Sequence, residues 1–462
     1  MKPILTIAVL TWKAAFRFRL FLVLALLLLA AVVGLPLLIK DDGTARGFTQ
    51  ILLTYTLSSI TGLLGLSTLW LACGTLARDI EEGPMQMVVV KPIARWQIWI
   101  GKWMGLMSLN AALVLLSGLG VFATLQWRAA RLPAAEQQKL RNEVLVARAS
   151  ARPPSLAAEI TQETDAQLQA AREKNPHLTR PEVAQLREQI RQNLLAYIQN
   201  VPPGYQQSWK IDLGYARNFL HGQPLYLRIK FNTSEQNVSQ TFPVLWQVGV
   251  PQETPLWQTA EPMSLAPDTF HEFEIPSDLF DSHGILTVTV INPNNIALLF
   301  TTTEGIEVLY RDGNFALNFA RGLGIIFCWL ALLAALGLTM ASFLSFPVAA
   351  FAACAALVVV FSSGILKNAV AEGTFMTYNQ ETGERGSPLD PVVIPIFQGI
   401  LTVINLARDF SPIDQLSAGR SITWLELCRA VLQIIFVLGG ILAACGIWAF
   451  TRRELAAAQP QS

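Results

Sequence analysis

The stretch FLVLALLLLAAVVGLPLLI, residues 21–39, decides the class of fold, because no charged side chain interrupts it before Lys40. An α-helix rises about 1.5 Å per residue, so roughly 20 apolar residues cross the ~30 Å hydrocarbon core of a bilayer. The stretch is longer than the apolar core of a secretory signal, which holds about 7–15 residues. We therefore interpret it as a membrane span.

The whole chain has the same bias toward apolar residues. Of its 462 residues, 52% are hydrophobic and 15% are charged, whereas soluble domains carry about a quarter charged residues. Further apolar stretches lie at 51–77, 98–126, 319–343, 347–366 and 427–450. The sequence thus predicts an α-helical polytopic, multi-pass membrane protein with six transmembrane helices.

Basic residues near the ends of the spans predict the topology, because lysine and arginine favour the cytoplasmic side. Residues 1–16 are too mixed to span and are predicted either as an amphipathic helix on the inner surface or as an extension of the first span. Both termini, including the tail 456–462, are expected inside (N-in/C-in), and the segment 367–424 outside as a re-entrant or interfacial segment. The basic residues behind this assignment are Lys2, Lys13, Arg17, Arg19, Arg452 and Arg453.

A water-soluble insert, residues 127–318, separates the third predicted span from the fourth. Its first part, 133–200, is predicted to be helical, with helices at 140–149, 156–172 and 181–198. Its second part alternates apolar and polar residues in short runs, which predicts an antiparallel β-sandwich or jelly roll over 205–312. The expected strands lie at 225–232, 243–250, 269–276, 284–292 and 305–312. We expect an α+β extracytoplasmic domain.

Sequence signatures of enzymes are missing from the chain. It has no G-x-x-x-x-G-K-[ST] phosphate loop, no H-E-x-x-H and no G-x-S-x-G, so no catalytic site or metal site is predicted. The net charge of +1 gives no indication of nucleic acid as a partner. Trp209 and Trp257 are candidate ligand-facing aromatics, although aromatics on alternating strands more often fill a core.

The stretch ARDIEEGPMQMVVVKPIARWQIWIGKWMG, residues 77–105, concentrates charges between two apolar runs. Gly83-Pro84 breaks the helix that leaves the second span, and a new helix then enters the third. The stretch is interpreted either as a docking loop for a partner protein or as an ordinary hairpin with inner-side charges. The candidate site residues of this loop, 78–97, and of the following turn are Arg78, Asp79, Glu81, Glu82, Gly83, Met85, Lys91, Pro92, Arg95, Gly101 and Lys102.

The spacing of these residues resembles the cytosolic loop of ABC-2-type ABC transporter permeases. Members commonly show E-x-G-T, then P-x-x-R, then I-x-x-G-K at the start of the third span. Here Glu81-x-Gly83 is followed by Pro92-x-x-Arg95-x-x-Ile98-x-x-Gly101-Lys102, with Pro84 where threonine is common. A second resemblance, Phe410-x-x-x-Asp414-x-Leu416-x-x-Gly419, precedes the last span. Together the resemblance covers roughly 1–126 and 317–455, and leaves the insert outside.

The resemblance implies a function, a set of partners and a location in the bacterial inner membrane. In that family the loop forms the coupling helix that contacts a separate ATPase subunit, which binds ATP and Mg²⁺. The chain itself would bind no cofactor and catalyse no reaction. It would pair with a second permease copy or paralogue in a dimer, contact membrane lipids, and act most simply as an exporter, with an envelope protein or glycan as a possible partner of the outer domain. The alternative is a membrane-anchored ligand-binding or sensor protein that uses the β-sandwich.

Overall fold

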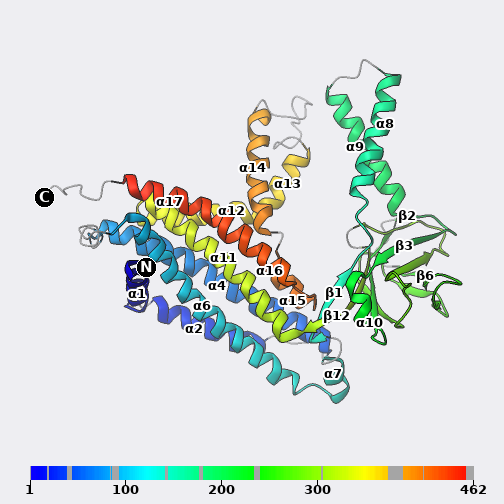
Figure 1. The fold of residues 1–462 in the computed structure, drawn as a ribbon, viewed down its shortest axis with the longest axis horizontal. Helices are drawn as coiled ribbons and strands as arrows, with labels where there is room; N and C mark the ends of the chain where they lie inside the picture. The colour runs from blue at the N-terminus through cyan, green and yellow to red at the C-terminus, as the bar shows by residue number, and fades with distance from the viewer. Residues whose placement is uncertain are drawn as a thin grey trace. The chain divides into compact units, whose positions relative to one another are not determined.

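The computed structural model describes residues 2–17, 20–38, 44–83, 85, 93–140, 144–175, 180–233, 240–302, 305–372, 389–408 and 410–453. The chain divides into two compact units. The helical unit comprises Met1–Ala147 and Gly313–Ser462, and the sheet unit comprises Arg148–Asp312 (Figure 1). The sheet unit is therefore narrower at both ends than the predicted insert 127–318.

Four helices of the described residues are long and apolar enough to cross a membrane. Three are continuous α-helices and the fourth contains a π-helical segment, η4. Mean hydropathy in their most apolar windows runs from 1.6 to 2.4, with few charges. These helices are compatible with a membrane-embedded protein. They are α4 (Ala45–Glu81), α6 (Arg95–Ala129), α11 (Phe315–Phe343) and the run α16 (Trp424–Ala430), η4 (Val431–Gly439), α17 (Gly440–Arg452).

The first and fifth predicted spans are shorter apolar helices in the structure. Among the described residues, their apolar parts are Val23–Leu38 and Phe346–Phe361, whereas a straight crossing takes roughly 20 residues. The count of six spans therefore stays a prediction. The first comprises α2 (Leu20–Leu29), η1 (Ala30–Gly34) and α3 (Leu35–Leu38), and the fifth comprises α12 (Phe346–Phe361) followed by α13 (Ser363–Glu372).

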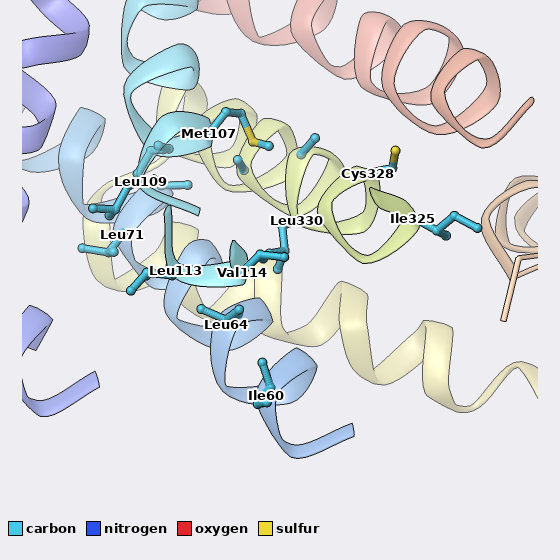
Figure 2. Packing of buried hydrophobic residues seen from close by; sticks show 14 of the residues in the cluster. Ile60, Leu64, Leu71, Met107, Leu109, Leu113, Val114, Ile325, Cys328 and Leu330 are labelled. Atoms are coloured by element: carbon cyan, nitrogen blue, oxygen red, sulfur yellow. The ribbon is translucent and has the colours of Figure 1, made fainter. Parts of the chain in front are cut away.

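Helix α11 packs against both α4 and α6, and the side chains between them form the main core of the helical unit (Figure 2). The helices approach one another most closely at small residues. A Cβ placed on Gly337 of α11 would lie 2.6 Å from the Ala72 Cβ and 3.0 Å from the Leu69 carbonyl oxygen of α4. Such contacts bring helix backbones together without large side chains between them.

The N-terminal helix α1 (Lys2–Arg17) packs along α6 through a Gly-x-x-x-Gly pattern. A Cβ on Gly101 would lie 2.8 Å from the Ile7 Cβ, and one on Gly105 would lie 2.7 Å from the Thr11 Cβ. The Trp12 indole N–H donates to the Ser108 hydroxyl at 2.6 Å. Because these contacts span more than a full turn of both helices, α1 is an integral part of the bundle.

Residues 127–147 also belong to the helical unit. The Glu136 carboxylate of α7 (Ala134–Lys139) accepts from the Ala45 backbone N–H at 2.8 Å and so caps α4. The Arg128 guanidinium donates to the Pro36 carbonyl and lies over the Phe48 ring. The compact helical unit thus extends past residue 127, where the predicted insert begins, and these polar groups satisfy helix ends of the bundle.

The segment before the last long helix folds onto the bundle. It contains α14 (Asp390–Arg408), which pairs with α13, and α15 (Pro412–Ser417), which packs on α4 and α11. The Asn318 side chain of α11 donates to the Arg420 carbonyl and accepts from the Ile422 N–H, both at 2.7 Å. Leu416 fills the space above Gly322, where a Cβ would meet its Cδ1 at 2.5 Å. The second motif of the sequence is therefore a packing element.

The sheet unit contains a helical hairpin, α8 (Ala157–Lys174) and α9 (Arg180–Gln199), as predicted for 156–172 and 181–198. A short turn of helix, η3 (Gly214–Ala216) and α10 (Arg217–Leu220), follows later. The strands are β1 (Val146–Ala151), β2 (Asn200–Val201), β3 (Gln206–Asp212), β4 (Leu225–Ile229), β5 (Asn232–Thr233), β6 (Phe242–Val248), β7 (Trp257–Gln258), β8 (Met263–Leu265), β9 (His271–Ile275), β10 (Ile285–Ile291), β11 (Leu298–Leu299) and β12 (Ile306–Asn314).

Two larger sheets share the core of this unit with a small three-stranded sheet of order β2-β11-β5. One has the order β1-β12-β4-β9, and the other has β3-β10-β6 with β7 and β8 continuing along the free edge of β6. The strands β1, β3, β4, β6, β7 with β8, β9, β10 and β12 can be numbered 1 to 8 along the chain, with β7 and β8 counted as one strand. In this numbering the two sheets have the strand orders 1-8-3-6 and 2-7-4-5, which is the strand order of a jelly roll. Leu227 and Val308 of the first sheet and Trp246 and Val288 of the second are completely buried in the same cluster.

One predicted helix of this region, 140–149, is wrong over residues 146–149, whereas the described residues Leu140 and Val144 are helical. Residues 140–149 were expected to be helical, but Val146–Ala151 form the edge strand β1 beside β12. Alanine and arginine favour a helix locally, and cross-strand pairing overrides that preference. The predicted helical part 133–200 therefore consists of α7, β1, α8 and α9.

Candidate functional site

The candidate coupling site lies where α4 ends and α6 begins. Helix α4 ends at Glu81, and Gly83 follows with φ +89°, a left-handed conformation that favours glycine. Helix α6 begins at Arg95. Two of the predicted site residues, Lys91 and Pro92, lie outside the described residues. The remaining site residues are described.

Asp79 and Lys102 form an ion pair between the two helices. The Lys102 ammonium donates to the Asp79 carboxylate at 2.5 Å and to the Thr75 carbonyl oxygen at 2.7 Å. The lysine side chain is 8% exposed and the aspartate side chain is 43% exposed. A nearly buried cation needs such partners, because desolvation without compensation is costly. The pair therefore joins α4 to α6 at the loop end.

Arg95 contacts the C-terminal end of α17. Its guanidinium donates to the carbonyl oxygens of Phe450, Thr451 and Arg453, each at 2.8 Å. The last carbonyls of a helix lack intrahelical donors and carry partial negative charge, so a cation there is favourable. Arg95 thus links the start of α6 to the last long helix of the chain.

Glu81 and Arg78 both contact the start of α12. The Glu81 carboxylate accepts from the Phe346 backbone N–H at 2.7 Å. The Ser345 hydroxyl, at the N-cap position, makes no capping hydrogen bond, so Glu81 supplies the acceptor that this helix start needs. The Arg78 guanidinium lies 4.3 Å from the centroid of the Phe346 ring. These contacts tie the end of α4 to α12.

The other site residues differ in exposure. Met85 is 2% exposed and belongs to the main core, and Gly101 provides the close contact with Ile7. Glu82 is exposed. Among the described acidic residues of the loop, Glu82 is thus the best placed to meet a partner.

The sequence does not indicate the intramolecular partners of these charged residues. Phe346 is 265 positions from Glu81, and Phe450 is 355 positions from Arg95. Only the Gly-x-x-x-Gly spacing at 101–105 was a usable signal, since it indicates close helix packing. The charges were found from the sequence, but their intramolecular roles were not.

Trp209 and Trp257 pack on aromatic side chains of the sheet unit. Their ring centroids lie 5.4 Å from Phe300 and 6.0 Å from Phe273, respectively, and both indoles are partly buried against the core. The contacts agree with the core-filling alternative. A ligand-facing role for these two residues gains no support.

The sheet unit also has a cavity that the sequence did not indicate. It measures about 360 Å³ and lies between α10 and the loop that joins β9 to β10. Its lining is Arg217, Asn218, His221, Asp278, Phe280, Asp281 and Ser282. No group of three histidine, cysteine, aspartate or glutamate residues suited to a metal occurs among the residues that the structure describes.

Comparison of the chain with protein-family models, with curated proteins and with solved structures finds no match.

Proposed function

We propose that the chain is the permease subunit of an ATP-driven ABC transporter, an exporter, coupled to a separate ATPase subunit through the connection between α4 and α6. The observation that carries the proposal is the set of contacts at this connection. Asp79–Lys102 joins α4 to α6, Glu81 caps α12, and Arg95 caps α17. A force applied to the connection would therefore act on several apolar helices together.

The proposed membrane arrangement has six spans with both termini inside. The four long apolar helices are joined in this proposal by Val23–Leu38 and Phe346–Phe361. An even number of spans puts both ends on one side, and the basic N-terminal segment favours the cytoplasm. The sheet unit would then be extracytoplasmic. Two copies, or one copy and a paralogue, would form the pathway, with ATP and Mg²⁺ on the ATPase.

Coupling would act through the packing contacts that α6 makes with α1 and α17. Gly101 and Gly105 hold α1 against the same helix whose first residue, Arg95, caps α17. ATP-driven movement of the connection would therefore shift α1, α6 and the end of α17 as one body. Chemical energy from outside the chain is required, since its own residues offer no phosphate-binding loop.

The first test is whether the full-length chain, purified from its native membrane under mild conditions, brings a P-loop ATPase with it. We expect one such ATPase in near-stoichiometric amount, cross-linked to a cysteine placed at Glu82. Absence of any P-loop ATPase from both the purified and the cross-linked material would contradict the proposal.

The second test reverses one exposed charge of the connection. Like charges brought together at an interface cost several kcal/mol of association, so Glu82→Lys should insert normally and lose the ATPase. Glu253→Lys, an exposed glutamate of the sheet unit, is the matched control. Equal retention of the ATPase by both variants would mean that the acidic end of α4 is not the contact.

The second candidate function is a membrane-anchored ligand-binding or sensor protein. The cavity of the sheet unit favours it, because concave sites with convergent polar groups are the usual form of small-molecule sites. The two functions differ in one measurement. A sensor reconstituted alone would respond to ligand without an ATPase, whereas the permease would move substrate only with the ATPase and ATP.

A further inference from the structure

The cavity of the sheet unit is built from two segments that come together only in the fold. One is the short helix α10, and the other is the loop between β9 and β10. Its volume, about 360 Å³, falls in the range of roughly 300–1,000 Å³ that small-molecule pockets occupy.

A hydrogen-bonded histidine–aspartate pair lines the cavity. The His221 Nδ1 lies 2.6 Å from the Asp278 Oδ1, and the Gly222 N–H donates to the other carboxylate oxygen at 3.3 Å. Asp278 has φ +64°, a conformation that is uncommon for a residue with a Cβ. The hydrogen bond from His221 lowers the pKa of Asp278, so the carboxylate is a permanent acceptor near neutral pH. The imidazole also packs 5.3 Å from the Phe280 ring.

Arg217 also lines the cavity, and its side chain is held by two contacts. One guanidinium N–H donates to the Ser282 carbonyl at 3.2 Å, which leaves further N–H donors on the same planar group. The aliphatic part of the side chain covers Gly284, where a Cβ would meet the Arg217 Cδ at 3.0 Å. A side chain larger than hydrogen at 284 would push this donor away from the cavity.

The lining carries both signs of charge together with an amide. Arg217 donates, the carboxylates of Asp278 and Asp281 accept, and Asn218 can do both. A ligand with a single strong charge would be repelled by the lining groups that carry the same charge. Hydroxyl groups each donate and accept, so a neutral ligand with several hydroxyl groups satisfies all of these side chains.

Exposed aromatic rings stand on the same turn as Arg217. Tyr215 is 93% exposed and Phe219 is 48% exposed. Large rings left in water offer apolar faces of the kind that stack on flat ligand surfaces. Sugar rings combine such an apolar face with a rim of hydroxyl groups.

We propose that this cavity of the sheet unit, with Arg217, Asn218, His221 and Asp278 as its polar groups, binds a neutral saccharide, and that Tyr215, which precedes Arg217 on the same turn and is not part of the lining, offers a neighbouring aromatic surface. The site is independent of the permease function, because it uses no residue of the connection between α4 and α6. Either proposal can fail while the other holds.

The test uses the full-length protein in lipid nanodiscs, free of sugar-based detergent. The probes are the methyl glycosides of glucose, galactose, mannose and N-acetylglucosamine, followed by saturation-transfer NMR and calorimetry. We expect at least one to bind with a dissociation constant between the micromolar and millimolar ranges. Asn218→Ala and Tyr215→Ala should each weaken that binding about tenfold, which corresponds to roughly 1.4 kcal/mol.

Tyr205→Ala is the matched control, because Tyr205 is also an exposed tyrosine (66%) of the sheet unit but lies outside the helical turn 214–220 that contributes Arg217 and Asn218 to the cavity. It should bind the saccharide as the unaltered protein does. The proposal is overturned if none of the four glycosides binds at ten millimolar, if Tyr205→Ala weakens binding as much as Tyr215→Ala, or if inorganic phosphate displaces the glycoside, since that would identify an anion site.

Discussion

The helical unit and the sheet unit solve the problem of packing in opposite ways. In the helical unit, glycines at 101, 105 and 337 let helices approach until backbone and Cβ atoms nearly touch. In the sheet unit, large side chains such as Trp246 and Phe231 interdigitate between two sheets and are almost fully buried. In a membrane the lipid tails are as apolar as leucine, so close van der Waals contact replaces the hydrophobic effect. In water, burial of large apolar side chains provides the stability.

The two units also use charge differently. In the helical unit, Lys102, Arg95 and Glu81 connect helix ends to one another. In the sheet unit, Glu307 is buried between Arg152 and Arg228 on a single sheet, and ties its strands together. The first arrangement joins different helices to one another, whereas the second joins strands within one sheet.

The largest effect is expected from Trp246→Ala. Deleting a fully buried large aromatic side chain costs about 3–5 kcal/mol. The sheet unit should become sensitive to protease at a lower temperature, while the helical unit keeps its protected fragments. Trp257→Ala, which removes a partly buried ring, should cost clearly less; equal losses would mean that the two indoles share one environment.

The second largest loss of stability is expected from breaking the charge cluster of the sheet unit, Glu307 with Arg152 and Arg228. Glu307 is 3% exposed and Arg152 is 40% exposed, so Glu307→Gln should cost about 3 kcal/mol, the low end for a broken buried pair. Urea unfolding followed by tryptophan fluorescence measures the loss. Asp165→Asn, in the exposed pair with Arg187, is the control and should change stability by less than about 1 kcal/mol. A Glu307 variant as stable as this control would show that the cluster contributes little.

A pair of glycine substitutions separates packing from backbone freedom in the helical unit. Gly105→Ala forces a methyl group to within 2.7 Å of the Thr11 Cβ and 2.9 Å of the Ala8 carbonyl, which should cost about 1–3 kcal/mol. Gly62→Ala meets nothing within 4 Å and should be neutral or stabilising by about 0.5–1 kcal/mol. Thermal unfolding in nanodiscs measures both. The two changes in the free energy of unfolding should have opposite signs. Changes of the same sign and size would mean that Gly105 does not hold α1 on α6.

The smallest effect concerns pH and the helical hairpin of the sheet unit. The hydrogen bond from Arg191 lowers the pKa of Glu188 to about 2 from its ordinary value of 4.5. A lowered pKa in the folded state adds stability above pH 4.5, and this is lost as the pH falls toward 2. Both side chains are about half exposed, so solvent screening limits the contribution to about 0.3–0.5 kcal/mol. Glu188→Gln should remove this part of the pH dependence between pH 4.5 and about 2, and an unchanged melting profile would contradict it.

Much of the fold follows from local patterns in the sequence. Uninterrupted apolar runs determine α4, α6 and α11, since only a helix satisfies every backbone group within its own segment. Alternating apolar residues determine β4, β6 and β10. The edge strand β1 was missed because its VARASA sequence has no strand signal of its own, and pairing with β12 decides its conformation.

The sequence by itself determined which residues of the connection are charged and where the helices break. Only the tertiary structure decided that Arg95 and Glu81 cap helices of their own chain, that α1 packs on α6, and that α10 and the β9–β10 loop together line an open cavity. The physical reason is distance along the chain. Periodicity reports which face of an element is apolar, but a hydrogen bond between positions hundreds of residues apart depends on how the elements meet in space.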